Sequence, residues 1–246
     1  MQRYFVTFSY DGTAYHGWQI QPNGNSVQEE LQRALGLLLG SRKEGWPVVG
    51  AGRTDAGVHA RLMVAHFDCD KALDGQQLAY RLNRLLPRDI SVDRIYPVSN
   101  EMHARFSAVS RTYHYYLYQH KNPFLRHYAW EVHYDLDFPL MQKAASLLLG
   151  EKDFACFCKS GADSATTVCR VSEARFVHQD DGQWMFVITA NRFLRNMVRA
   201  VVGTLVEVGR HRLSLDGFQQ VLQSGSRSDA GESVPGNALF LWDVKY

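Results

Sequence analysis

The order of strand-like and helix-like patterns is the feature that most constrains the fold of this chain. Residues 4–10 alternate large apolar side chains with smaller or polar ones, and Asp11-Gly12 ends the run. This pattern predicts a strand that carries its large side chains on one face. Residues 26–40 predict a helix that opens with a Ser-x-x-Glu capping box at Ser26 and closes at Gly40. Because strands and helices mix without strict βαβ alternation, the pattern favours the α+β class.

The rest of the chain continues this mixture. Further strands are predicted at 64–67, 113–118, 184–189 and 239–244, and further helices at 73–86, 140–149, 194–209 and 214–222. Strand and helix follow each other in both halves, but no residue-level repeat is visible, so an internal duplication is only a hypothesis. Residues 224–236 are rich in glycine and serine and predict a mobile loop.

Composition limits the class of protein. The 246 residues are 46% hydrophobic and 21% charged, as in ordinary globular proteins of one large or two small domains. We expect no membrane span, because no apolar run approaches 18 residues, and no secretory signal precedes the first strand pattern. Four cysteines without framework or zinc spacing favour a cytoplasmic protein without a metal. The net charge of +2 means that an anionic partner must be attracted by a local patch.

One short segment carries the strongest chemical signal. Residues 52–60 read Gly-Arg-Thr-Asp-Ala-Gly-Val-His-Ala, with Arg53 and Asp55 between two glycines. Gly52 and Gly57 are expected to permit a tight backbone that presents Asp55 at the tip of a turn. A carboxylate held in this way can act as a nucleophile or a general base, whereas an ordinary turn aspartate bonds its own backbone. The glycines lack Walker spacing, which argues against a phosphate cradle.

Arginines and aromatic residues gather in a second segment. Arg105 and Arg111 precede the β-prone run that contains Tyr113 and Tyr115. Guanidinium groups bind phosphates, and aromatic faces stack on unpaired bases, so this segment is typical of RNA recognition. The competing interpretation is that the tyrosines pack in the core of a sheet.

Three further arginines follow helical spacing. Arg192, Arg195 and Arg199 stand at i, i+3 and i+7, which predicts that they share one face of the helix at 194–209. This row would suit a phosphate backbone, and the alternative is a solvated basic face.

Together, four ordered motifs resemble one family, the tRNA pseudouridine synthase A (TruA) family. They are residues 52–60, residues 10–21 with Ser26-Val27-Gln28, His103-Ala104-Arg105-Phe106 with Arg111-x-Tyr113-x-Tyr115, and residues 191–203. The resemblance covers nearly the whole chain. It implies two related ferredoxin/RRM-like halves with antiparallel sheets around a central basic catalytic cleft. Residues 1–106 would carry the catalytic loop, and residues 107–246 would carry the stacking tyrosine and the basic helix.

The resemblance also implies a function. Members of the family are homodimers that convert uridine to pseudouridine in the anticodon stem-loop of tRNA, at positions 38, 39 and 40. They flip the target base out of the stem and use neither a metal nor an organic cofactor. Here Leu62-Met63 replaces the usual Gly-Gln pair, and Ala238 replaces a usual glycine, which leaves the substrate range open.

Residue roles follow by motif. The resemblance implies that Asp55 is the nucleophile, that Tyr113 stacks on the target uracil, and that Arg199 pairs with Asp55. Arg53 would help to displace the base, and Leu239 would supply an apolar wall. The remaining arginines, at 105, 111, 192 and 195, would hold the tRNA.

Two other functions compete with this one. The first is a non-catalytic tRNA-binding or RNA-chaperone protein on the same fold. The second is a carboxylate-dependent hydrolase, which needs a second carboxylate, yet Asp55 is the only acidic residue between Glu44 and Asp68.

Overall fold

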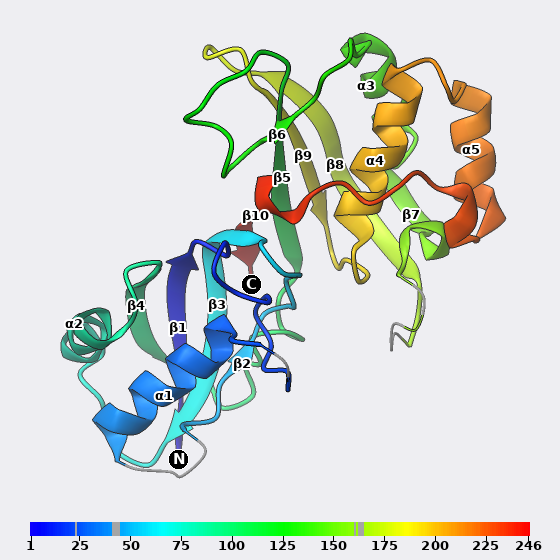
Figure 1. Ribbon diagram of the computed structural model, residues 1–246. Helices are drawn as coiled ribbons and strands as arrows, with labels where there is room; N and C mark the ends of the chain where they lie inside the picture. Colours follow the sequence, from blue (N-terminus) through cyan, green and yellow to red (C-terminus); the bar gives the residue numbers. More distant parts are fainter. Residues whose placement is uncertain (23, 41–44, 160, 162–164) are drawn as a thin grey trace. The chain divides into compact units, whose positions relative to one another are not determined.

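The chain forms two compact units. The computed structural model describes residues 1–246 except 23, 41–44, 160 and 162–164 (Figure 1). Unit 1 consists of Met1–Val109 and Phe240–Tyr246, and unit 2 consists of Ser110–Leu239. Unit 2 is therefore inserted in the sequence of unit 1. Our division at 106 and 107 left the final strand with the second half, whereas its pairing with a strand of unit 1 places residues 240–246 in unit 1.

The described residues of unit 1 form paired strands and two helices. Its elements are β1 (Gln2–Tyr10), α1 (Val27–Leu39), β2 (Val49–Gly50), β3 (His59–Cys69), α2 (Gly75–Leu85), β4 (Ile90–Val98) and most of β10 (Leu239–Lys245). The strand order is β4-β1-β3-β10, and β1 runs antiparallel to both β3 and β4. Strand β10 runs parallel to β3, with Phe240 opposite His59.

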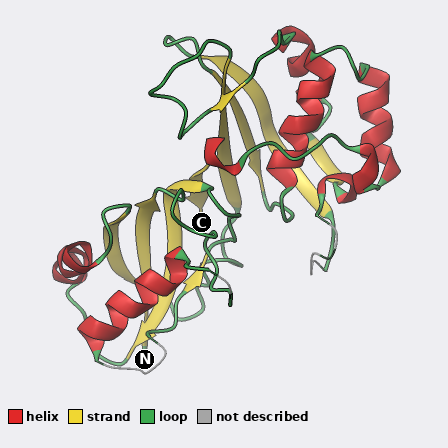
Figure 2. Ribbon diagram, viewed as in Figure 1, coloured by secondary structure: helices red, strands yellow, loops and turns green. Residues whose placement is uncertain are grey.

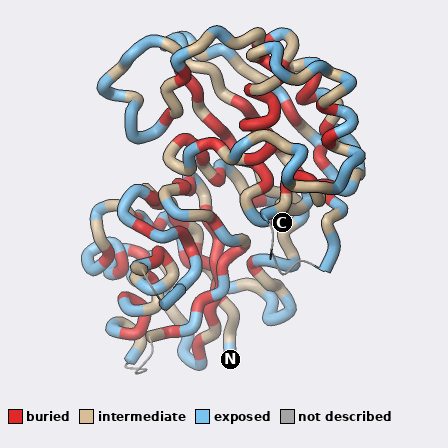
Figure 3. Tube along the Cα trace, turned by 45° about the vertical axis from the view of Figure 1, so that its right-hand side comes forward, coloured by how far each residue is buried: buried red, intermediate tan, exposed pale blue. Residues whose placement is uncertain are grey.

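The predicted first strand and first helix of unit 1 are present. Strand β1 buries Tyr4, Val6, Phe8 and Tyr10, as the alternation indicated, and it also buries Phe5 on its other face. Helix α1 begins after Ser26, whose side chain accepts a hydrogen bond from the backbone N–H of Glu29, as the capping box requires. Its buried residues include Val27, Leu31, Ala34 and Leu35, and Figure 3 shows the buried parts of the chain in red.

The described residues of unit 2 form paired strands, three α-helices and three short 3-10 helices. Its elements are β5 (Ser110–Tyr118), β6 (Trp130–Glu131), α3 (Phe138–Ser146), β7 (Gly150–Asp153), η1 (Ala155–Phe157), β8 (Val168–His178), β9 (Trp184–Ala190), α4 (Met197–Gly209), α5 (Leu215–Ser224), η2 (Arg227–Asp229) and η3 (Gly236–Ala238). The order β5-β9-β8-β7 is antiparallel throughout, and β6 adds to β5 in parallel. Helices α3, α4 and α5 gather on one side of this sheet (Figure 2).

The two units together confirm an α+β protein with mostly antiparallel strand pairing. The finer expectation of two related ferredoxin/RRM-like halves stays a prediction. In the described part of the chain, no helix is long and apolar enough to cross a membrane.

Besides the short strands β2, β6 and β7, the long strands β4 and β8 were missed in the sequence. Strand β4 buries Ile90, Val92 and Ile95, so its alternation is interrupted where the pairing of β1 with β4 shifts register. Strand β8 buries Cys169 and Val171 before a similar shift in its pairing with β9. A bulge adds one residue to a strand, which breaks the two-residue period on which prediction depends.

Helix α4 begins later than predicted. The apolar stripe starts at Leu194, but Asn196 has a left-handed backbone with φ of +66°, and the helix starts at Met197. Of the thirteen residues of α4, only Arg199 and Glu207 lie outside its buried set. The N-terminal part of this buried helix therefore carries a single charged side chain, Arg199.

Candidate active site

The segment around Asp55 forms a turn that leads into β3. The backbone N–H of Val58 donates to the carbonyl oxygen of Asp55 at 3.2 Å, and Gly57 between them has φ of +74°, as the third residue of a type II turn does. Asp55 is half-buried, whereas Arg53 and Ala56 are exposed. The expected need for glycine thus holds at Gly57. It fails at Gly52, where an added Cβ would meet nothing within 4 Å.

Residues 10–18 of unit 1 hold this turn in place through hydrogen bonds. The backbone N–H of Trp18 donates to the carbonyl oxygen of Thr54 at 3.3 Å, and the hydroxyls of Tyr10 and Thr54 are 2.8 Å apart. The backbone N–H of Gly57 donates to the carbonyl oxygen of Tyr15 at 3.2 Å. Residues on both sides of Asp55 are therefore held by the chain that follows β1.

Gly17 packs closely against the turn. Its φ is +101°, and a Cβ there would overlap the carbonyl oxygen of Thr54 and lie 3.1 Å from the carbonyl carbon of Asp55. Gly17 lies in the motif of residues 10–21, but the sequence did not indicate this role. Its neighbours Tyr10 and Thr54 were missed in the same way, because a contact between segments so distant in sequence is tertiary.

His59 closes the other end of the turn. This buried histidine accepts a hydrogen bond at Nδ1 from the backbone N–H of Gly12 at 3.0 Å, and Asp11 Oδ1 lies 3.0 Å from the same atom. The His59 ring stacks on Phe240 of β10, with ring centroids 4.5 Å apart. His59 is thus a structural residue, and it joins three separate segments of unit 1.

In unit 2, the predicted aromatic residue lies on β5. Tyr113 pairs in register with Ile188 of β9, is 8% exposed, and meets the edge of Phe193 at a centroid distance of 4.9 Å. Leu239, the predicted apolar wall, is 5% exposed at the start of β10. The core interpretation of Tyr113 is therefore consistent with its burial, and the stacking role stays a prediction.

Arg199 is oriented through its own Nε. It donates from Nε to the carbonyl oxygen of Val234 at 2.7 Å, and the backbone N–H of Val234 donates back to the Arg199 carbonyl at 3.3 Å. The planar guanidinium is thereby fixed in direction at the first turn of α4.

The segment that holds Arg199, residues 230–235, lies along α4. Gly231 donates its backbone N–H to Thr204 Oγ1 at 2.8 Å, and Asn196 donates to Ser233 Oγ at 2.5 Å. A Cβ on Gly203 would overlap the carbonyl oxygen of Glu232. The region predicted as a mobile loop is therefore bound to a buried helix. The Tyr115 hydroxyl also donates to Pro235 at 3.0 Å, which links this segment to β5.

The prediction that three arginines share one helical face is wrong. Only Arg199 lies in α4, because the left-handed Asn196 separates it from Arg192 and Arg195. Arg195 is exposed, and its carbonyl oxygen accepts a hydrogen bond from the backbone N–H of Lys159 at 3.1 Å. Burial raises the pKa of the nearby Cys158 thiol, and the positive charges of Arg192 and Arg195 partly oppose this rise.

The other two predicted arginines lie in different units. Arg111 donates to the carbonyl oxygen of Asn191 at 2.9 Å in unit 2, next in sequence to Arg192. Arg105 of unit 1 is exposed, and its guanidinium carbon lies 5.6 Å from the centre of the Phe106 ring.

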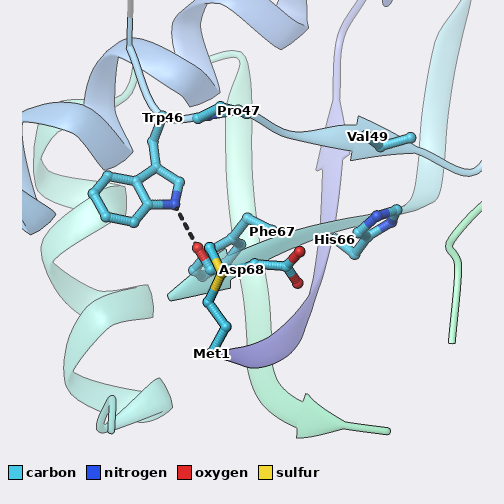
Figure 4. A pocket seen from close by; sticks show the side chains of 7 residues that line it. All are labelled: Met1, Trp46, Pro47, Val49, His66, Phe67 and Asp68. Atoms are coloured by element: carbon cyan, nitrogen blue, oxygen red, sulfur yellow. Dashed lines mark hydrogen bonds between the residues drawn. The ribbon is translucent and has the colours of Figure 1, made fainter. Parts of the chain in front are cut away.

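A cavity of 230 Å³ in unit 1 does not coincide with the predicted site (Figure 4). It is lined by Met1, Trp46, Pro47, Val49, His66, Phe67 and Asp68. His66 lies seven residues along β3 from His59, roughly 23 Å for an extended strand, so the cavity is at the end of β3 remote from the Asp55 turn. Within the described ranges, no group of three or more His, Cys, Asp or Glu side chains could hold a metal ion.

The fold and these residues define a class: an α+β protein with a half-buried carboxylate on a turn of one unit and an oriented arginine, a buried tyrosine and a buried leucine in the other. Comparison with known families makes the class specific. The family described as tRNA pseudouridine synthase matches residues 6–107 and 144–246. The chain belongs to this family of isomerases.

Full-length relatives agree with this assignment. The chain is 52% identical to the tRNA pseudouridine synthase A of Bacteroides fragilis, with 100% of this chain and 97% of the relative covered. It is 53% identical to that of Bacteroides thetaiotaomicron, with coverages of 100% and 91%. It is 41% identical to that of Bacillus subtilis, with coverages of 98% and 97%.

Proposed function

We propose that the protein converts uridine to pseudouridine in the anticodon stem-loop of tRNA, at positions 38, 39 and 40, and that Asp55 starts the reaction. The observation that carries this proposal is the fixed turn at Asp55, in a chain that belongs to the tRNA pseudouridine synthase family. A carboxylate whose flanking residues are held by hydrogen bonds needs little reorganisation before it reacts.

The reaction is an internal exchange of bonds. The bond between ribose C1′ and uracil N1 breaks, and a bond between C1′ and C5 forms. C5 loses a proton and N1 gains one, so substrate and product have the same composition and no oxidant or co-reactant is needed. Asp55 can act by attack on C1′, by attack on the uracil ring, or by removal of a ribose proton.

The other residues have roles that fit their surroundings. We assign Arg53, which is exposed beside Asp55, to the space left by the flipped base, because unstacking a base costs a few kcal/mol. Tyr113 and Leu239, both buried, supply the stacking partner and the dry wall for detached uracil. Arg199, whose Nε donates to the carbonyl oxygen of Val234, is the ion-pair partner of Asp55 in this proposal.

Phosphate binding falls to the remaining arginines. We assign Arg105, Arg111, Arg192 and Arg195 to the tRNA backbone. We further propose that the protein acts as a cytoplasmic homodimer, as the resemblance implies. Light scattering on the purified protein tests the oligomeric state, and a mass of one chain at micromolar concentration contradicts it.

The direct test uses an unmodified tRNA transcript and the Asp55→Asn variant. We expect wild-type protein to form pseudouridine at positions 38–40, and Asp55→Asn to form none while it still binds the transcript. Asp70→Asn is the control, because Asp70 is an exposed carboxylate elsewhere in unit 1. Chemical mapping of pseudouridine reads the product. A wild-type protein that binds tRNA without modifying it supports the non-catalytic alternative, and an active Asp55→Asn variant refutes the role of Asp55.

A further inference from the structure

The connection between β5 and β6, residues 119–129, has a defined backbone. Phe124 donates its N–H to Asn122 Oδ1 at 3.0 Å, and the N–H of Leu125 donates to the Asn122 carbonyl at 3.2 Å. The backbone N–H groups of Tyr128 and Ala129 both donate to the Leu125 carbonyl at 2.9 Å. This 119–129 loop is therefore two consecutive turns that fix where its side chains stand.

These turns expose aromatic side chains. Phe124 is 86% exposed, the largest fraction among the exposed large apolar side chains of the described residues, and Tyr128 is 45% exposed. An ordered backbone that holds a phenylalanine in water forgoes the stabilisation that its burial would give. Such a residue on a loop indicates a binding surface.

The positive charge of the residues around Phe124 favours an anionic partner. Lys121 and Arg126 lie in the loop, and residues 119–130 contain no aspartate or glutamate. Aromatic rings interleaved with cations are the features that bind unpaired bases of RNA. A symmetric contact between two copies of the chain would instead bring two such positive loops together, which like charges disfavour.

The loop is also connected to the wall of the proposed uracil pocket. Asn237 donates from Nδ2 to the Arg126 carbonyl at 3.2 Å, and Asn237 lies in η3, two residues before Leu239. Tyr113 is five residues from Tyr118 on β5, roughly 17 Å along the strand, so the loop begins about that far from the pocket. The loop lies outside the ranges that the family description matches.

We propose that the 119–129 loop is a second contact site for the tRNA substrate, in which Phe124 stacks on an unpaired base and Arg126 binds a neighbouring phosphate. This inference rests on the proposed function, because it takes tRNA as the substrate. Stacking at this distance from the reacting base increases affinity for the correct RNA without entering the chemical step.

The test compares Phe124→Ala with Phe124→Trp and with Tyr80→Ala, which removes another exposed aromatic ring, on α2. With an unmodified tRNA transcript we expect Phe124→Ala to raise the Kd and KM about 5- to 150-fold, with kcat within a factor of two of wild type. Phe124→Trp keeps the stacking surface and stays within threefold of wild type, and Tyr80→Ala is unchanged. Arg126→Gln reduces the slope of log Kd against log salt by about 0.7 to 0.9.

The outcomes separate this inference from the function on which it rests. A wild-type protein that neither binds nor modifies tRNA removes the proposed function itself. A wild-type protein that is active while Phe124→Ala has an unchanged Kd and KM overturns only the loop proposal. Light scattering tests the alternative that the loop contacts a second copy of the chain. If Phe124→Ala halves the mass of the particle, the loop is an interface between two copies and the proposal is wrong.

Discussion

Gly17 provides the sharpest test of the idea that the chain after β1 sets the position of Asp55. A methyl group at Gly17 would overlap the carbonyl oxygen of Thr54, in a backbone with φ of +101°. Gly40 has φ of +113°, but a Cβ there meets nothing within 4 Å. The variants Gly17→Ala and Gly40→Ala therefore share the strain of an alanine at positive φ and differ in the contact with the turn.

The expected magnitudes follow from this difference. An alanine held at such a positive φ costs about 1–3 kcal/mol in either variant, which leaves a protein of ordinary stability folded at 25 °C. In Gly17→Ala the Thr54 carbonyl must also move by about 1 Å to reach van der Waals distance, and the displacement carries Asp55 with it. Misplacement of a catalytic group by about 1 Å lowers the rate by about 100-fold.

The assay measures two quantities for each variant. Single-turnover formation of pseudouridine on a tRNA transcript gives the rate, and urea unfolding gives the free energy of unfolding. We expect a rate about 100-fold below wild type for Gly17→Ala and within twofold for Gly40→Ala. Equal rates for the two folded variants refute the reasoning. If Gly17→Ala does not fold, Tyr10→Phe replaces it, because it removes only the 2.8 Å contact with the Thr54 hydroxyl. We expect about a 5- to 10-fold loss of rate from that change, and a Tyr10→Phe rate equal to wild type likewise refutes the reasoning.

Three other predictions concern stability and tRNA binding. Thr204→Val removes the acceptor of the Gly231 N–H and should lower the free energy of unfolding by about 1–3 kcal/mol, whereas Thr204→Ser restores most of it; equal urea midpoints for the two variants contradict this. Burial lowers the pKa values of His66 and His114 to about 4, from 6.5 in the unfolded chain, so the unfolded chain binds more protons between these values. Stability should therefore be lost as pH falls from 6.5 to 4, by up to about 3 kcal/mol for each histidine, and a urea midpoint that does not change between pH 7 and pH 4.5 contradicts this. Arg195→Ala should weaken tRNA binding and reduce its salt slope by about the share of one phosphate, and an unchanged slope removes Arg195 from the contact surface.

Local signals allowed much of the fold to be predicted. The cap at Ser26, the alternation of β1 and the left-handed Gly57 depend on residues within one turn or strand, so the sequence alone reveals them. Strands β4 and β8 were missed because a shift in register interrupts their alternation. The start of α4 was missed because an apolar stripe continues through Asn196, whose left-handed backbone ends the helical pattern.

The candidate site was predicted in part for the same reason. Asp55 lies in a turn that its neighbours specify, and the sequence indicated it directly. The supports of that turn come from Gly17, Tyr10 and His59 through contacts across unit 1, and no spacing in the sequence reports such contacts. The hydrogen bond from Arg199 Nε to the Val234 carbonyl oxygen was missed for a further reason. The glycine and serine content of residues 224–236 predicted a mobile loop there.

The return of the chain to unit 1 gives the protein a fixed order of assembly during synthesis. Strand β10 follows the whole of unit 2 in the sequence, yet its Phe240 supplies the ring on which His59 stacks. Unit 2 is continuous in sequence, so all its residues have been synthesised when the ribosome reaches Leu239. Unit 1 also needs residues 240–246, which are synthesised later. A nascent chain that stops short of Phe240 therefore carries the Asp55 turn on an unfinished sheet, so unit 1 is completed only after unit 2 has been synthesised.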